Sequence, residues 1–113
     1  MYEWKGEEAP PEFDASTGAA YVGKYILLGV TYLDPSGKEL EKVQMHGVIK
    51  TATAEEIVVD LRGVYEGKTW SMPPDLRAIS EARPGKYMLR ATGEIVTDPD
   101  LVSTWTVVKP TLH

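Results

Sequence analysis

The side chains best suited to chemistry in this sequence are His46, Arg90 and Glu94. An imidazole beside a guanidinium and a carboxylate could move a proton or hold a charged ligand. His46 lies in "KVQMHGVIKT" (42–51), and the other two lie in "KYMLRATGEIVT" (86–97). Both segments alternate polar and apolar residues, so each predicts a strand with one polar face. If the two strands are neighbours, these faces form a mixed polar patch that contains Lys42, Gln44, His46, Arg90, Thr92 and Glu94.

Two tryptophans are the other candidates for a binding surface. Trp70 and Trp105 each lie in a short segment rich in Thr and Ser, "KTWSM" and "STWTV". A tryptophan in a strand usually packs into the core because of the large area that it buries. At the mouth of a small barrel it can instead hold a peptide or a base. The candidate ligand or partner contacts are therefore His46, Trp70, Arg90, Glu94 and Trp105.

No familiar catalytic or metal-binding pattern is present. The sequence has no cysteine and only two histidines, His46 and His113, without the spacing of a metal site. It lacks a Gly-x-Ser-x-Gly elbow, a P-loop and a dinucleotide fingerprint. We therefore assign no catalytic residue, no metal and no cofactor, and we expect a non-enzymatic protein. For His46 alone, the ordinary alternative is a surface or half-buried hydrogen-bonding residue.

A repeated tripeptide, Pro-Asp-Leu, occurs at 74–76 and at 99–101. Asp75 and Asp100 could form a pair of carboxylates for glycoside chemistry. Their flanking residues differ, and "DPSG" (34–37) shows the same proline placement in a third position. We interpret both aspartates as turn or cap residues that bind nearby backbone N–H groups.

The spacing of strands and turns predicts an all-β fold. In "KYILLGVTYL" (24–33) the even positions from Ile26 to Tyr32 form an apolar face, and the turn "DPSG" follows. Further strands are expected at 42–51, 55–65, 69–72, 86–97 and 103–108. Gly47 in mid-strand suggests a sharp bend or a close approach. About six strands without a long helical period predict a small, partly open β-barrel, SH3-like or Sm-like, with an OB-like barrel as the second choice. At most one short helical turn is expected, near 75–82.

Charge divides the 113 residues into two parts. Residues 1–18 hold five acidic residues against Lys5, which indicates an acidic, proline-containing N-terminal extension. Disordered segments are usually poor in aromatic residues, so Tyr2, Trp4 and Phe13 favour docking of the extension on the domain or on a partner about as much as a mobile tail. Residues 19–113 form a single domain with 12 acidic and 11 basic residues. A nearly neutral body gives little attraction to a phosphate backbone, so nucleic-acid binding is disfavoured.

Five segments carry a resemblance to a group of small bacterial proteins of unassigned function: "GKYILLGVTYLD", "QMHGVI", "WSMPPDL", "PGKYMLRATGE" and "DPDLVSTWTV". The similarity covers roughly residues 22–107 and omits the acidic extension. It implies one compact domain. It implies no activity, ligand or cofactor.

The sequence thus predicts a non-catalytic β-barrel module that recognises a protein or peptide partner, with an inhibitor or immunity-type protein as one specific form. The alternative is a small-ligand binder or minor enzyme with a site around His46, Arg90 and Trp70. We expect a cytoplasmic protein, since no apolar run approaches the ~20 residues of a membrane span and the first residues lack a signal-peptide pattern. A homodimer through an edge strand, with "STWTVV" as the edge, is a further possibility.

Overall fold

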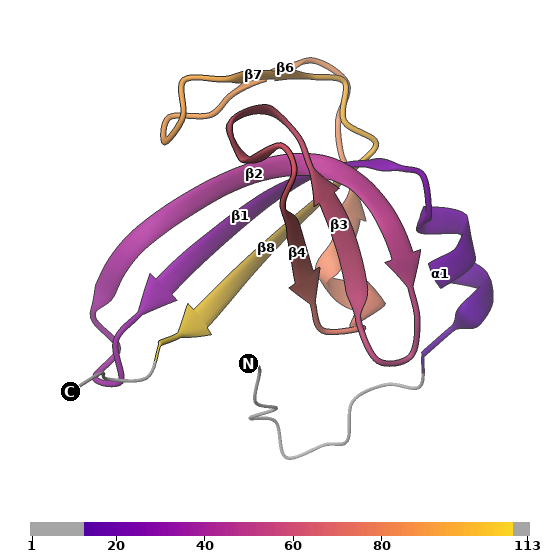
Figure 1. Ribbon diagram of the computed structural model, residues 1–113, viewed down its shortest axis with the longest axis horizontal. Coiled ribbons are helices and arrows are strands. Elements are labelled where there is room, and N and C mark those ends of the chain that lie inside the picture. Colours follow the sequence, from indigo (N-terminus) through magenta and orange to yellow (C-terminus); the bar gives the residue numbers. More distant parts are fainter. Residues whose placement is uncertain (1–12, 110–113) are drawn as a thin grey trace.

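The computed structural model describes residues 13–109, which form a mostly β structure with one α-helix (Figure 1). The elements are α1 (Ala15–Tyr21), β1 (Tyr25–Leu33), β2 (Glu39–Ala52), β3 (Ile57–Leu61), β4 (Thr69–Met72), β5 (Ile79–Glu81), β6 (Lys86–Met88), β7 (Ile95–Thr97) and β8 (Leu101–Val108). Single 3₁₀ turns lie at Gly63–Tyr65 and Leu76–Ala78. Residues 1–12, including Tyr2 and Trp4, and His113 lie outside the described part of the chain. The prediction of a β-rich fold is confirmed.

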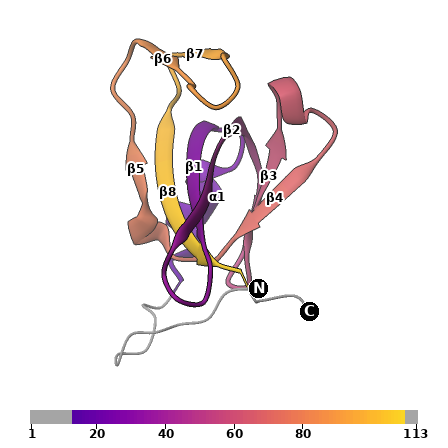
Figure 2. The same ribbon diagram turned by 90° about the vertical axis from the view of Figure 1, so that its left-hand side faces the viewer.

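Six strands form one strongly curved sheet in the order β4-β3-β2-β1-β8-β5. All neighbours are antiparallel except β1 and β8, which run parallel from the Ile26–Leu101 pair to the Leu33–Val108 pair. Figure 2 shows β5 and β8 on one side of the sheet and β3 and β4 on the other. In the described residues no strand pairing joins β4 to β5, so the sheet is not closed into a barrel.

The main core lies on the concave side of this sheet. The alternate residues Ile26, Leu28 and Val30 of β1 are almost wholly buried, as their period-two spacing predicts. Equivalent positions of the other strands complete the cluster: Met45, Ile49, Ile57, Val59, Leu61, Met72, Ile79 and Leu101. Burying one face in this way fixes the register, because a slip of one residue would turn every apolar side chain outward.

Gly47 allows the sheet to curve. A Cβ atom at this position would collide with the carbonyl oxygen of Asp60 and would lie 2.9 Å from the Cα of Leu61. Strand β3 therefore approaches β2 more closely than any residue with a side chain would permit. Strand β2 as a whole arches over the core (Figure 1), and the close approach expected at Gly47 from the sequence is present.

The segment 86–97 is not the single strand that its alternation predicts. It forms a short hairpin, β6 and β7, that lies across the convex side of the sheet (Figure 1). The turn closes because Leu89 N–H donates to the Glu94 carbonyl and Gly93 N–H donates to the Leu89 carbonyl, with Gly93 at φ 79°. Leu89 and Val96 then pack with Leu27 in a second, smaller core.

Helix α1 also differs from the expectation that the only helical turn lies near 75–82. Asp14 caps α1, because its carboxylate accepts hydrogen bonds from the N–H groups of Ser16 and Thr17. The Phe13 ring covers Gly18, where a Cβ would collide with it. The assignment of residues 1–18 to an N-terminal extension overlooked this cap. The turn expected near 75–82 is present at Leu76–Ala78, capped by Asp75.

Both aspartates of the repeated tripeptide bind backbone groups, as interpreted. Asp75 accepts from Arg77 N–H and pairs with the Arg77 guanidinium at 3.0 Å. Asp100 accepts from Tyr25 N–H at 2.9 Å and so joins the start of β8 to the start of β1. In residues 13–109 no helix has the length and apolar character to cross a membrane.

Candidate functional site

The hairpin brings two of the candidate residues together. His46 of β2 points to the convex side, and Glu94 enters from the turn that precedes β7. The Nε2 atom of His46 lies 3.1 Å from Oε2 of Glu94, and the two side chains are only 11% and 19% exposed. Of the mixed polar patch expected from the sequence, His46 and Glu94 therefore meet, brought together by a hairpin packed on the sheet face rather than by two neighbouring strands.

Tyr25 completes a network that we call the Tyr25–His46–Glu94 network. The Tyr25 hydroxyl lies 2.7 Å from Nδ1 of His46. With Glu94 ionised, Nε2–H of a neutral imidazole donates to the carboxylate and Nδ1 accepts from the phenol. Burial is the main cause that raises the pKa of Tyr25, so the phenol stays protonated, although Arg62 lies 5.4 Å from the centre of its ring and opposes this shift.

Glu94 is held in its charged form at the centre of the site. Burial by itself raises the pKa of this carboxyl, but hydrogen bonding from His46, Thr92 and the Val64 N–H outweighs burial and lowers it. The 3₁₀ turn at Gly63–Tyr65 comes close: a Cβ at Gly63 (φ 69°) would collide with Glu94 Oε2 and lie 2.7 Å from His46 Nε2. Three separate segments therefore meet at this carboxylate.

The network suits a structural role. Both ring nitrogens of His46 are engaged within the protein, and the phenol of Tyr25 is kept neutral. A general base needs a nitrogen directed at a substrate, and a nucleophile needs an activated hydroxyl. Glu94 Oε1 is buried and accepts no bond of ordinary hydrogen-bond geometry from a described residue. The network fastens the hairpin and the Gly63 turn to the sheet.

Next to this network, an open groove of about 460 Å³ lies on the convex side of the sheet. We call it the convex-face groove. Its floor comes from the middle of β1, β2 and β8, and one wall comes from the hairpin turn. Gln44 joins floor and wall, because its Oε1 accepts from Ala91 N–H at 3.0 Å. The lining residues are Gly29, Val30, Thr31, Lys42, Val43, Gln44, Arg90, Ala91 and Thr104.

Gly29 is the unusual residue of the groove floor. It lies in the middle of β1, paired with Gln44 and Thr104, where glycine is intrinsically unfavourable. Its φ angle is not left-handed, and a Cβ would meet only Thr104 Cγ2 at an ordinary 3.6 Å. The fold therefore does not require glycine here. What the missing side chain provides is an open floor for the groove.

The remaining sequence candidates are divided between two faces. Arg90 lines the convex-face groove, is exposed and forms no ion pair with any residue in 13–109. Trp70 and Trp105 lie on the opposite, concave side, half-buried against the main core. The suggested site around His46, Arg90 and Trp70 is thus not assembled as one surface. Sequence reasoning missed Tyr25 and Gly29, because the role of each depends on what lies against the convex face of β1.

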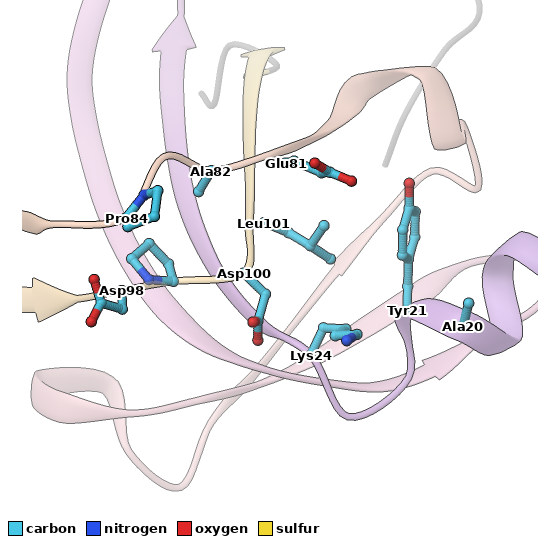
Figure 3. A pocket seen from close by; sticks show the side chains of 10 residues that line it. Ala20, Tyr21, Lys24, Glu81, Ala82, Pro84, Asp98, Asp100 and Leu101 are labelled. Carbon is cyan, nitrogen blue, oxygen red and sulfur yellow. The ribbon is translucent and has the colours of Figure 1, made fainter.

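A second cavity, of about 570 Å³, lies between the end of α1 and the β5–β8 edge. Figure 3 shows the side chains of Tyr21, Lys24, Glu81 and Asp100 around it. Its two aspartates already bind backbone groups, since Asp98 accepts from Gly85 N–H at 2.7 Å and Asp100 accepts from Tyr25 N–H. This cavity therefore has a ready structural explanation. Among the described residues, no group of three or more His, Cys, Asp or Glu side chains is placed to hold a metal ion.

Comparison with known proteins adds no assignment. No protein-family model, no curated protein and no solved structure matches this chain. The resemblance to small bacterial proteins of unassigned function stays a prediction.

Proposed function

We propose that this protein is a non-catalytic binding module that holds a peptide segment of a protein partner in the convex-face groove. The observation that carries the proposal is Gly29. A glycine in mid-strand lowers stability by roughly 0.5–1 kcal/mol relative to alanine, and nothing in the fold demands it at this position. A frequent reason for glycine in a strand is the close approach of a ligand or of another backbone.

The wall of the groove is also held in a defined position. The Gln44–Ala91 hydrogen bond and the Tyr25–His46–Glu94 network fix the turn that carries Arg90. A preformed groove binds more tightly than one that must be ordered on binding, because less conformational entropy is lost. The candidate residues His46 and Glu94 therefore support the binding surface from beneath, and Arg90 contacts the partner.

A small-molecule ligand is the second candidate. The volume of about 460 Å³ falls in the range of sites for small ligands. The groove is open along its length, however, and its rim is formed by long, exposed side chains, Lys42 and Arg90. Such sites bury too little of a small ligand to bind it tightly, whereas an extended segment adds contacts beyond the groove.

The experiment is a selection of random peptides on the immobilised full-length protein. Selected peptides are then measured by calorimetry against the wild type and Gly29→Val, which places a β-branched side chain on the groove floor. Lys68→Ala, an exposed change beside β4 and outside the groove, is the matched control. We expect peptides that bind the wild type and Lys68→Ala equally and bind Gly29→Val at least about tenfold more weakly. Peptides that bind all three proteins equally, or no selected peptide at all, would contradict the proposal.

Four finer expectations belong to the same proposal. The curvature of β2 (Figure 1) and the close approach of β3 at Gly47 support an SH3-like or Sm-like half-open barrel as the description of the curved sheet. Within residues 13–109, strand β5 pairs only with Leu101–Ser103 of β8, so the outer edge of residues 104–108 supports a homodimer through this edge. A cytoplasmic location and an inhibitor or immunity-type role remain predictions from the sequence.

A further inference from the structure

The charges along the convex-face groove point to the chemistry of its ligand. Of the nine residues that line it, Lys42 and Arg90 are basic and none is acidic, in a protein whose net charge is −5. Because most of the excess of acidic residues lies in residues 1–18, the groove is a local positive site on a body of residues 19–113 that is nearly neutral. Charge complementarity of this kind selects the partner and orients it during encounter.

Arg90 is the better placed of the two cations. It forms no ion pair with a residue in 13–109, whereas Lys42 lies 3.8 Å from Glu39 with both side chains largely exposed. A surface pair of this type contributes little and can exchange for another carboxylate. The guanidinium offers several N–H donors in a fixed plane that fits the two oxygens of a carboxylate.

The floor of the groove offers further polar groups. Thr104 lies directly across from Gly29 on β8, Thr31 lies two residues along β1 from it, and both residues line the groove. Because Gly29 has no side chain, a ligand can approach the backbone of β1 beside these two residues. Gln44 is already engaged by Ala91 N–H, so its carbonyl oxygen does not compete for Arg90.

We propose that the convex-face groove recognises an acidic side chain, Asp or Glu, in an extended peptide segment that crosses Gly29, with Arg90 as the main anion contact. This inference rests on the proposed function and specifies its ligand. The carboxylate comes from a peptide rather than from a free small acid, because an isolated anion between two exposed cations is held weakly in water. A peptide gains additional contacts with the floor and the wall.

The test uses the peptides obtained by the selection described above. Each acidic residue of a groove-dependent peptide is replaced by its amide, Glu→Gln or Asp→Asn. Binding is measured on the wild type, on Arg90→Gln and on Lys86→Gln, which removes an exposed cation of the same hairpin outside the groove. We expect that, at one acidic position of the peptide, the amide replacement weakens binding about tenfold or more to the wild type and to Lys86→Gln. The same replacement should have little further effect on the already weakened binding to Arg90→Gln.

Two results would overturn this inference while leaving the proposed function in place. The first is a set of groove-dependent peptides that bind equally well as acids and as amides. The second is an equal loss of peptide affinity in Arg90→Gln and in Lys86→Gln, which would indicate that only the long-range electrostatic field of the protein attracts the peptide. If free N-acetylglutamate displaced the peptides at the concentration at which the peptides themselves bind, the ligand would be a small carboxylate, and the peptide assignment would be wrong. If no peptide depends on Gly29, the proposed function itself fails.

Discussion

At the scale of single residues, the position of Glu94 decides what His46 can do. A histidine on the polar face of a strand has many possible partners, and the sequence left it as either a surface hydrogen-bonding residue or a ligand contact. The structure gives it Tyr25 at Nδ1 and Glu94 at Nε2. The charge of half-buried Glu94 is tolerated here because its Oε2 accepts hydrogen bonds from His46 and from Val64 N–H.

Acid should weaken this network in a defined pH range. The pKa of Glu94 is lowered below its ordinary value of 4.5 by the His46, Thr92 and Val64 hydrogen bonds that outweigh burial. A lowered pKa in the folded state means that the charged form contributes stability above the unfolded-state pKa, and that this contribution is lost as the pH falls through the folded-state pKa.

We therefore expect the wild type to be more stable than Glu94→Gln above about pH 5, and the difference to shrink as the pH falls below the ordinary glutamate pKa. Urea denaturation of both proteins across this range measures the difference. The comparison removes the contributions of Asp14, Asp34 and Asp75, whose pKa values are also lowered. A difference in the free energy of unfolding that stayed constant as the pH was lowered would contradict an ionised Glu94 in the network.

At the scale of elements, two glycines in neighbouring strands have opposite meanings. Gly47 lets β2 bend and lets β3 pass close to it, whereas Gly29 in β1 has ordinary space around its Cα. Both were equally visible as mid-strand glycines in the sequence. Only the packing around them distinguishes a glycine that the fold needs from one that leaves a groove open.

Substitution by alanine should separate these two roles. We expect Gly47→Ala to lower the free energy of unfolding by about 1–3 kcal/mol, because its Cβ collides with the backbone of β3, which cannot move aside as a side chain would. Gly29→Ala should leave stability unchanged or raise it by up to ~1 kcal/mol. Urea unfolding measures these changes, and equal m-values for the wild type and both variants would show that only stability has changed. An equal loss for the two variants would show that Gly29 is also structural, and the argument for the groove would fall with it.

At the scale of the whole molecule, the protein has one large core and one small core on opposite faces of the same sheet. The concave cluster joins all six strands of the sheet, with Leu101 at the start of β8, and the convex cluster consists of Leu27, Leu89 and Val96 with half-buried neighbours. The hairpin is attached through the smaller cluster and the Tyr25–His46–Glu94 network. Parts with few buried apolar contacts open at lower free energy than the main core.

Removing one side chain from each core should therefore give different patterns of unfolding. Ile26→Ala, in the main core, should lower the free energy of unfolding by about 2–5 kcal/mol. The protection of all amides that exchange through global unfolding should fall together. Leu89→Ala should increase hydrogen exchange mainly at the hairpin, including Leu89 N–H, and leave the β1–β2 pairs protected. Exchange measured by NMR, residue by residue, distinguishes the two patterns. If Leu89→Ala destabilised all amides equally, the hairpin would be part of the same cooperative unit as the sheet.

The local signals in the sequence were sufficient for the strands and turns that depend on nearby residues. The alternation of β1, the "DPSG" turn, strand β4 and the Asp75 cap are all present, because period-two burial and side-chain capping act over a few residues. The cap of α1 by Asp14 was equally local and was overlooked. The division of 86–97 into a hairpin was hidden by an alternation that suits one strand or two.

The tertiary structure alone decided which side chains meet. The parallel pairing of β1 with β8 joins residues 75 positions apart, as in the bond between Asp100 and Tyr25, and no local pattern encodes it. The same holds for Glu94 beneath the hairpin and for Arg90 beside Gly29. His46, Arg90 and Glu94 could be chosen from their chemistry, but whether each faces solvent, a partner or another side chain depends on long-range packing of the hairpin on the sheet.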